Sequence, residues 1–573
     1  MAETILSPGV LARENDSSFI TSQPITVGSA VVGPTAKGPV EIPTVVTSYS
    51  EFTSTFGGAI ESGSDSYNYM TGISAYNYFQ NGGESLLVTR VTSGSFSSAN
   101  STTINNTITT ESNAFILETL SEGNIMNNSG SESGGALSLG TADNVRWEIA
   151  SVNTSSGVFS LLVRRGNDNN REKTVLETWN NLSLDPKAAN YVEAVIGNST
   201  QVVLSDNGTY YVQKQGNFTN KSRYIRVKSV AAKTPDYFDN NGTAKTAFTA
   251  SLPTLGSGSF TAATGNLFSQ VAGTAALFYD KVTTGNIQGL TATDYDIAIK
   301  LLGNTDDYAY SSVTAPGLTS QNASATVTTL VNNSVSRGDN LAIVDLVNYQ
   351  ANVGTVVTQA AGFDSSYAAA YWPWLQTIDP ATGQQVWVPA SVMIPGVLAF
   401  TDRSSDAWFA PAGLTRGALG NVIRAERKLP TSTRDTLYEA NINPIATFPQ
   451  SGVVVFGQKT LQKRASALDR INVRRLLITL KSYITQIADT LVFEQNSIAT
   501  RNSFLTQVNP YLESVQQRQG LYAFRVVMDE TNNTADVVDR NELVGQIFLQ
   551  PTKTAEYILL DFNVTPTGAS FPG

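Results

Sequence analysis

Hydrophobic residues follow two different spacings within the first 92 residues. The continuous apolar run from Ile25 to Val32, closed by Gly33-Pro34, is typical of a buried strand. Helical spacing follows at Tyr69, Ile73, Tyr76 and Phe79. Asn81-Gly82-Gly83 then predicts the end of that helix, and Leu86 to Val91 predicts a second strand. A strand, a helix and a strand in this order indicate an α/β unit.

The pattern changes at about residue 93. Long stretches of Ser, Thr, Asn and Gly separate short β-like runs, such as Val145 to Val152 and Val158 to Arg165. A Gly- and Ser-rich segment around Leu255 to Gly265 closes the region. We interpret residues 93–284 as a β-rich insertion that faces outward and is divided in two. Its texture alone would also fit an adhesion or glycan-binding module.

Alternating helix and strand patterns return near residue 290. Leu341 to Leu346 predicts a short buried strand of a parallel or mixed sheet, with Asp345 near its end. Four of the six tryptophans lie between Trp372 and Trp408, among several prolines. Such a block is either a packed loop system or a ligand cleft. Packing is favoured, because Trp and Pro most often fill cores and fix loops.

The last 120 residues have the most regular pattern. A helix is predicted after Asn472 as N-cap, from the 3-4 spacing of Leu476, Leu477, Leu480, Ile484, Ile487 and Leu491. A second helix carries Phe504, Val508, Leu512 and Val515, ends before Gly520, and should be kinked or split by Pro510. Strands are predicted at Leu521 to Met528, Val544 to Leu549 and Tyr557 to Val564.

These patterns predict an α+β or mixed α/β multidomain fold. We expect an extended N-terminal arm at 1–23 and the first part of a core at 24–92. The β-rich insertion spans 93–284, the second part of the core spans 285–550, and a C-terminal strand and arm span 551–573.

Composition excludes much chemistry. The 573 residues include no cysteine and no histidine, which removes disulfides, thiol nucleophiles, Cys/His zinc sites and Ser-His-Asp triads. We therefore expect no enzyme, no catalytic residues, no metal and no cofactor. The net charge of −10 makes nucleic acid a poor partner. The N-terminus does not match a secretory signal, and no apolar stretch approaches membrane-spanning length, so we expect no membrane insertion.

Short motifs recur in a definite order. Near the N-terminus they are Ser7-Pro8-Gly9-Val10, Val32-Gly33, Lys37-Gly38-Pro39, Phe56-Gly57 and Asn81-Gly82-Gly83. In the middle they are Tyr371-Trp372-Pro373-Trp374, Val388-Pro389, Gly396-Val397 and Ala410-Pro411-Ala412. Towards the C-terminus they are Phe456-Gly457, Thr460-Leu461, Ile471 to Leu476, Phe493-Glu494 with Asn496, and Asn532-Asn533. Over residues 1–92 and about 285–573, this order and spacing resemble the contractile bacteriophage tail sheath protein family.

The resemblance implies a structural protein that forms hexameric rings, stacked as a helical polymer around a tail tube. It implies contraction that drives the tube through a target envelope without nucleotide hydrolysis. The partners would be other copies of the chain, the tail tube protein, and baseplate and tail terminator proteins. The location would be the virion tail, assembled in the cytoplasm of the bacterial host.

One segment reverses the acidic balance of the chain. Between residues 451 and 482, seven positive charges stand against Asp469 alone: Lys459, Lys463, Arg464, Arg470, Arg474, Arg475 and Lys481. The functional interpretation is a docking patch for an acidic partner, which the resemblance implies is the tail tube. A solvated helix face is an equal alternative, and nucleic acid is the weakest, because no aromatic stacking platform accompanies the charges.

Both ends of the chain suit strand addition to a neighbouring copy. Leu6 and Val10 lie in the extended N-terminal segment, and Ile558, Leu560, Phe562 and Val564 share one face of the last predicted strand. Such segments add to an open sheet edge through backbone hydrogen bonds. The alternative is that both segments pack on their own subunit.

Two other interpretations concern possible chemistry. Gly452 to Thr460 comes close to a phosphate-binding loop, but Gln458 stands where that loop requires Lys, so we expect a strand ending in a turn. Asp345, Asp364, Asp379 and Asp402 could supply a glycosidase pair, although nothing in the sequence pairs them and turn or capping roles are favoured. The rival functions are thus a β-rich surface adhesin or glycan-binding protein, and a hydrolase that uses carboxylates.

Overall fold

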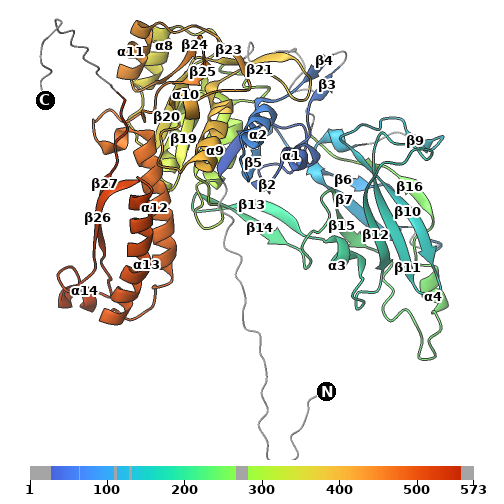
Figure 1. Ribbon diagram of the computed structural model, residues 1–573. Helices are drawn as coiled ribbons and strands as arrows, with labels where there is room; N and C mark the ends of the chain where they lie inside the picture. Colours follow the sequence, from blue (N-terminus) through green and yellow to red (C-terminus); the bar gives the residue numbers. More distant parts are fainter. Residues whose placement is uncertain (1–27, 63–64, 109–112, 128–131, 266–281, 557–573) are drawn as a thin grey trace, which may run out of the picture.

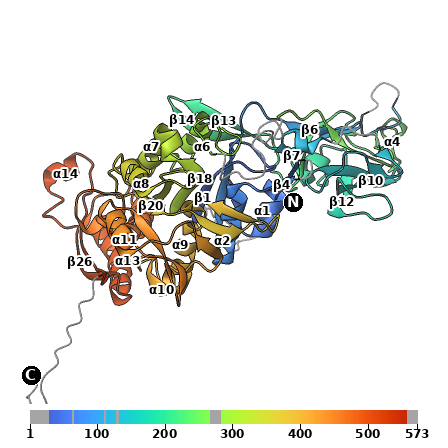
Figure 2. The same ribbon diagram turned by 90° about the horizontal axis from the view of Figure 1, so that it is seen from above.

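The computed structural model describes residues 28–62, 65–108, 113–127, 132–265 and 282–556. Figure 1 shows three regions: a central α/β body, a β-rich insertion on one side, and a pair of long helices on the other. The view from above in Figure 2 places the insertion and the helix pair at opposite ends of the molecule. The predicted mixed α/β multidomain fold class is confirmed.

The central body is built on one eight-stranded sheet, in the order β2-β5-β1-β18-β19-β20-β24-β25. The strands are β1 (Ser29–Gly33), β2 (Thr44–Val46), β5 (Leu86–Arg90), β18 (Ser312–Thr319), β19 (Leu341–Asp345), β20 (Ala368–Trp372), β24 (Asn443–Phe448) and β25 (Gly452–Val455). The six inner strands run parallel, and β2 and β25 close the two edges antiparallel to their neighbours. Strands from residues 29–90 therefore pair directly with strands from residues 312–455.

Helices cover both faces of this sheet. They are α1 (Tyr49–Phe56), α2 (Met70–Gln80), α6 (Asp296–Leu301), α7 (Ser320–Arg337), α8 (Val353–Ala360), α9 (Ile394–Ser404), α10 (Gly413–Arg416) and α11 (Thr431–Glu439). The single-turn helices η2 (Ala292–Tyr295), η3 (Ala390–Val392) and η4 (Ala467–Asp469) lie in the connections. In β19, Ala342 and Val344 pack into one core cluster, while Leu341 and Ile343 pack into another. This two-residue alternation, buried on both sides, is what a parallel strand between helix layers requires.

The predicted tryptophan block is packed. Trp372 and Trp374 are almost fully buried on opposite faces of the sheet, and Trp387 and Trp408 are buried as well. The small sheet β22-β21-β23 supports this region, with β21 at Leu375–Ile378, β22 at Gln385–Val388 and β23 at Val422–Ala425. The preference for packing over a ligand cleft is confirmed for these four side chains.

The insertion consists mainly of two four-stranded antiparallel sheets. One contains β6 (Ser98–Ser101), β7 (Phe115–Glu122), β15 (Ile225–Val230) and β17 (Phe260–Thr261). The other contains β10 (Val145–Asn153), β11 (Val158–Arg165), β12 (Val175–Ser183) and β16 (Gly256–Gly258). Residues of both sheets, such as Phe115 and Phe159, pack in one hydrophobic cluster. Among the residues described, the division is therefore into two sheets that share a core.

Smaller elements complete the insertion and the first part of the core. The hairpin of β13 (Thr200–Asp206) and β14 (Thr209–Gln215) reaches from the insertion to α6. The hairpins β3–β4 (Ile60–Ser62 and Asp65–Tyr67) and β8–β9 (Glu132–Ser133 and Ala136–Leu137) lie in loops. The short helices α3 (Val192–Ile196), α4 (Thr246–Thr249) and η1 (Asn124–Met126) are local turns.

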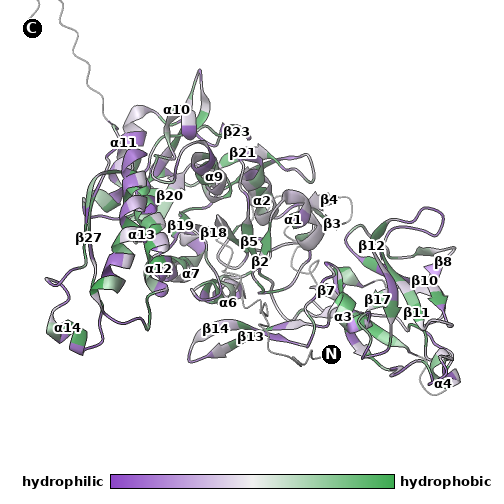
Figure 3. Ribbon diagram, turned by 60° about the horizontal axis from the view of Figure 1, so that its bottom comes forward, coloured by the Kyte–Doolittle hydropathy of each residue, from purple (hydrophilic) through white to green (hydrophobic). Residues whose placement is uncertain are grey.

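The C-terminal region is a helix pair packed against a two-stranded sheet. Helices α12 (Ile471–Asp489) and α13 (Ile498–Gln517) bury their apolar sides together with β26 (Leu521–Val527) and β27 (Gln546–Pro551). The short helix α14 (Ala535–Asp539) lies in the connection between these strands. Figure 3 shows hydrophobic and hydrophilic residues side by side on α13, as expected for a helix with only one buried side.

Most of the predicted elements are confirmed, namely α2, β5, β10, β11, β19 and β26. Two predictions were wrong in detail. Asn472 is not the N-cap of α12, because the helix already begins at Ile471 with Arg470 in the cap position. Pro510 does not split α13, which continues through it. The strand predicted at Val544 to Leu549 occurs two residues later as β27, and the strand predicted at Tyr557 to Val564 lies outside the described residues.

Candidate functional site: the basic segment, the end of the chain and an open hairpin

The basic segment runs from β25 through a loop into α12. After β25, residues 456–470 cross the end of the central sheet, and Leu461 donates its amide to the carbonyl of Ala368 beside β20. Gln458 and Thr460 are buried within this loop. The segment that comes close to a phosphate-binding loop is therefore a strand followed by a packed turn, as predicted.

Two of the seven basic residues are structural within the subunit. Arg475 is 5% exposed and donates to both carboxylate oxygens of Asp402 at 2.6 Å. Arg474 is buried against the Tyr367 ring, 4.0 Å from its centroid, and donates to the Ser366 hydroxyl. The Arg475 charge is paired with Asp402, and the Arg474 guanidinium is stacked on an aromatic ring inside the subunit. Neither side chain is therefore presented to a docking partner.

Three basic residues are exposed. Lys463 and Arg464 lie in the loop before α12, and Lys481 lies on α12. Lys463 donates to the Ala361 carbonyl at 2.8 Å, and Lys481 donates to the Gly338 carbonyl at 3.1 Å. Among the described residues, no acidic side chain pairs with these three charges, so any docking role of the segment rests mainly on these three residues.

The remaining two, Lys459 and Arg470, belong to a compact cluster with Tyr438. Lys459 Nζ donates to the Tyr438 carbonyl at 2.6 Å and lies 4.3 Å from the centre of its ring. Arg470 Nε donates to Glu556 Oε1 at 2.7 Å. Burial and the nearby Arg470 charge lower the pKa of Lys459. This cluster ties the basic segment to the last described residues of the chain.

Glu556 receives hydrogen bonds from three separate parts of the fold. Arg470 and Gln458 donate to its Oε1 at 2.7 and 3.0 Å, and the Tyr438 hydroxyl donates to its Oε2 at 2.8 Å. Burial alone would raise the pKa of this carboxyl, but these donors hold the pKa of Glu556 below its usual value. We refer to Glu556 with Tyr438, Gln458 and Arg470 as the Glu556 anchor. It was missed from the sequence because its members are 86 to 118 residues distant from Glu556.

The hairpin β26–β27 has two open edges. In the part of the chain that the structure describes, each of these strands pairs only with the other. Phe524, Val526, Ile547 and Leu549 pack towards the helix pair, whereas Tyr522 and Phe548 are 63% and 56% exposed. An isolated two-stranded sheet is marginal, and an open strand edge is ready to accept another strand.

The predicted arm residues cannot be placed. Leu6, Val10, Ile558, Leu560, Phe562 and Val564 all lie outside the described residues. Strand addition by these segments therefore stays a prediction.

The four aspartates weighed as catalytic groups have separate partners. Asp345 is fully buried and accepts from the Ser391 hydroxyl at 2.6 Å, while burial raises its pKa to about 6. Asp379 accepts from Asn68 and Thr382, and Asp364 accepts from the Lys463 amide. Asp402 holds Arg475. Each of these contacts is a capping, turn or pairing role.

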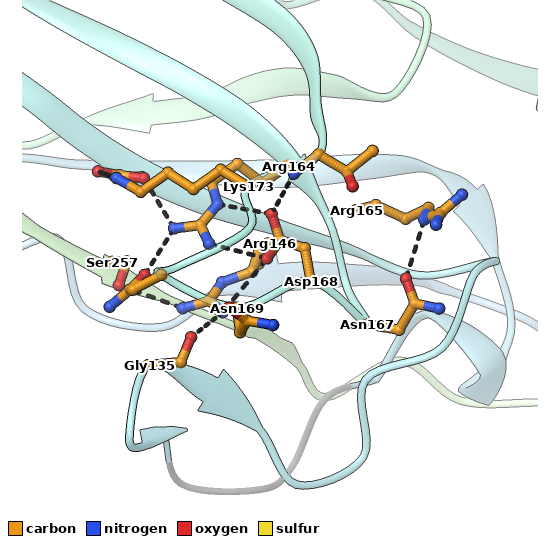
Figure 4. A network of polar contacts seen from close by, with 12 residues as sticks. Gly135, Arg146, Arg164, Arg165, Asn167, Asp168, Asn169, Lys173 and Ser257 are labelled. Carbon is orange, nitrogen blue, oxygen red and sulfur yellow. Dashed lines mark hydrogen bonds and ion pairs between the residues drawn. The ribbon is translucent and has the colours of Figure 1, made fainter.

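The insertion contains the largest charged network among the described residues (Figure 4). The side chains of Arg146 and Arg164 are fully buried, and Asp168 lies between them. Arg164 donates to both Asp168 oxygens at 2.8 and 2.9 Å and to Glu148 at 2.8 Å. These charges neutralise one another within the sheet and its covering loops, so they are not available to a ligand.

The described residues contain no group of three or more acidic side chains that could hold a metal ion. No helix in the described ranges is both long and apolar enough to cross a membrane.

Comparison with known families identifies the region that carries these features. The family "Phage tail sheath protein central domain" matches residues 288–461, and "Phage tail sheath C-terminal domain" matches residues 464–565. These ranges contain the second part of the central sheet, the basic segment apart from Lys463, the Glu556 anchor and the open hairpin. Over residues 288–565, the chain matches the phage tail sheath family.

Individual relatives agree with this assignment. The tail sheath protein of Vibrio phage KVP40 is 41% identical over 230 residues, which is 40% of this chain and 33% of that protein. The tail sheath protein of Enterobacteria phage T4 is 39% identical over 230 residues, covering 40% of this chain and 35% of that protein. The match thus spans about a third of the length of these curated relatives.

The fold of this chain is also similar to a solved structure. The crystal structure of a sheath tail protein from Listeria innocua has a TM-score of 0.53 and 10% sequence identity. The similarity covers 92% of this chain and 95% of that one. At this level of identity, it supports the fold.

Proposed function

We propose that this chain is the structural subunit of a contractile tail sheath. It polymerises as stacked hexameric rings around a tail tube, and contraction of the polymer drives the tube through the target cell envelope. Baseplate and tail terminator proteins cap the polymer, which is assembled in the host cytoplasm and lies in the virion tail. The family match supports this role, and the matched relatives are tail sheath proteins of phages.

The hairpin β26–β27 supports a mechanism of assembly, because among the described residues it has open edges and two exposed aromatic side chains. A strand added to either edge would satisfy unpaired backbone groups and cover Tyr522 or Phe548. The proposed donors are the N-terminal arm, with Leu6 and Val10, and the C-terminal strand, with Ile558, Leu560, Phe562 and Val564. Each donor comes from a neighbouring copy.

Exchange of this kind explains how a helical polymer arises. An arm of one copy and a hairpin of the next are different surfaces, so their contact is heterologous and repeats in an open helix. Backbone pairing also makes few demands on side chains, so subunits can rotate as rigid bodies while their connections persist. The energy for contraction is stored in a metastable extended lattice behind a kinetic barrier, and no nucleotide is hydrolysed.

Docking to the tail tube is assigned to the exposed members of the basic segment. Lys463, Arg464 and Lys481 form no ion pair with another described residue. They would attract an acidic tube surface and lose that attraction as salt rises. The other four residues, Lys459, Arg470, Arg474 and Arg475, act through the packing that presents these three.

Deletion of the arms tests the mechanism. A chain lacking residues 1–20 and a chain lacking residues 557–573 should each give folded subunits that do not form tubes. Circular dichroism would monitor folding, and sedimentation with negative-stain microscopy would monitor polymerisation. Normal tubes from both deletions would refute strand exchange.

A further inference from the structure

The Glu556 anchor lies at the point where the described chain ends. Residues 552–556 follow β27 and run past Trp408, η4 and α11 before the C-terminal segment 557–573 begins. Cavities open on both sides of this stretch, and Thr554, Ala555 and Glu556 line two of them, of about 420 and 600 Å³. The stretch is therefore flanked by space, and the Glu556 side chain is its firmest attachment.

The partly buried Glu556 side chain is held from several directions. Three donors from α11, from the loop after β25 and from the residue before α12 converge on one carboxylate. Gln458 also donates to the Thr554 hydroxyl at 2.6 Å, so two residues of the same stretch are bound. Lys459 and Arg470 both lie near the Tyr438 ring, at 4.3 and 5.9 Å from its centroid. Charge-assisted hydrogen bonds from rigid elements fix position as well as contributing energy.

We propose that Glu556 is a positioning residue for assembly: the Glu556 anchor fixes where the C-terminal arm leaves the subunit, so that the arm meets the open hairpin of a second copy. The inference rests on the proposed strand exchange and deepens it. An arm with a mobile starting point binds more weakly, because its conformational entropy is lost on binding. A fixed starting point reduces that entropy cost. The anchor removes most of this mobility in advance.

The anchor can be weakened in steps without touching the hairpin. Y438F removes one donor, E556Q removes the charge, and E556A removes all three bonds. The critical concentration for polymerisation should rise in that order, by about tenfold or more for E556A. E542Q is the matched control, since Glu542 pairs with Arg540 at 3.1 Å in an exposed position and is not a member of the Glu556 anchor. Its critical concentration should stay within about twofold of wild type.

A direct measurement separates the anchor from the exchange. The chain has no cysteine, so A555C places a single spin label on an exposed residue beside the anchor. The label should be immobilised in the unpolymerised A555C subunit and mobile in the double variant A555C/E556A. Equal label mobility with and without E556A would overturn the anchor.

The two hypotheses then fail in different ways. If the wild-type chain does not polymerise, strand exchange fails, and the label still decides the anchor. If the wild type polymerises and E556A has the same critical concentration, the positioning role is overturned although exchange survives. A rise in critical concentration with an unchanged unfolding midpoint of the free subunit supports the role.

Discussion

At the end of β19, the carboxyl group of Asp345 is enclosed by protein on every side. It accepts hydrogen bonds from the Ser391 hydroxyl and from the amides of Gly317 and Ser391, but burial outweighs them and raises its pKa to about 6. The folded state therefore holds this proton more tightly than the unfolded state does. Stability from this group is fully present below its ordinary pKa of 3.8 and is lost as pH rises towards about 6.

Asp345→Asn tests this assignment. Asparagine carries no charge at either pH, so its stability relative to wild type should improve by about 2 kcal/mol between about pH 4 and pH 7. Urea unfolding of both proteins at the two pH values would measure the change. A difference in stability that does not vary with pH would contradict the burial of an ionised carboxylate at this position.

Charge reversal separates the structural from the exposed basic residues. Arg474→Glu with Arg475→Glu places acid beside Asp402 and removes the stacked guanidinium, so the subunit should lose about 3 kcal/mol or more of stability. Lys463→Glu, Arg464→Glu and Lys481→Glu together should leave folding within about 1 kcal/mol of wild type and weaken tube binding at low salt. Unfolding curves and co-sedimentation with the tail tube would measure both.

Two outcomes would contradict these assignments. Stable folding of the Arg474 and Arg475 variant would show that these contacts contribute little. Unchanged tube binding by the triple variant at low salt would remove the docking role from the exposed residues.

At the scale of elements, strands and helices with a clear period were predictable and their ends were not. The burial of β19 on both faces followed from the unbroken apolar run at Leu341 to Leu346. The start of α12 did not follow, because the Asn472 side chain is buried and donates to the Trp408 carbonyl instead of capping the helix. The side chain of Asn472 thus makes a contact with a residue 64 positions away, which the local sequence does not reveal.

The candidate site was predictable only in part, for the same reason. A local excess of charge revealed the basic segment, but charge alone does not tell an exposed lysine from a buried arginine. Arg475 is occupied by Asp402, which is 73 residues distant, and Glu556 collects donors from three elements. Only the folded chain brings these residues together.

Pro510 provides a test at this scale. Helix α13 continues through an exposed proline that lacks the amide to bond the carbonyl four residues earlier. Pro510→Ala should stabilise the helix by about 1–3 kcal/mol and slow amide exchange in its neighbouring turns by about tenfold or more. Hydrogen exchange followed by mass spectrometry would measure this. Exchange that is unchanged or faster would contradict a continuous, strained helix.

At the scale of the whole molecule, the insertion is a separate packing unit. Its sheets bury their own cluster, while Val91 before it and Ile287 after it pack together in the cluster of the central sheet. The contacts that join the two are the packing of β14 on α6 and a few polar contacts, such as Arg90 to the Glu122 carbonyl and Lys37 to Asp143. The core and the insertion therefore depend largely on different side chains for their stability.

Removal of the insertion should leave the core able to fold. Replacing residues 97–264 by a short Gly/Ser linker should give a soluble chain that keeps the central sheet, the helix pair and the ability to polymerise. Circular dichroism and sedimentation would measure folding and assembly. Loss of folding would show that the core needs the insertion, with the fully buried Arg90 the first residue to examine.

The central claim is that copies of this chain join by adding strands to the hairpin β26–β27. Its most direct test is a cryo-electron microscopy map of tubes grown from the purified protein on the tail tube. Strand exchange predicts an enlarged sheet in which strands from neighbouring copies flank β26 and β27. Tubes whose hairpin stays two-stranded, or a protein that remains monomeric at every concentration with the tube supplied, would contradict it.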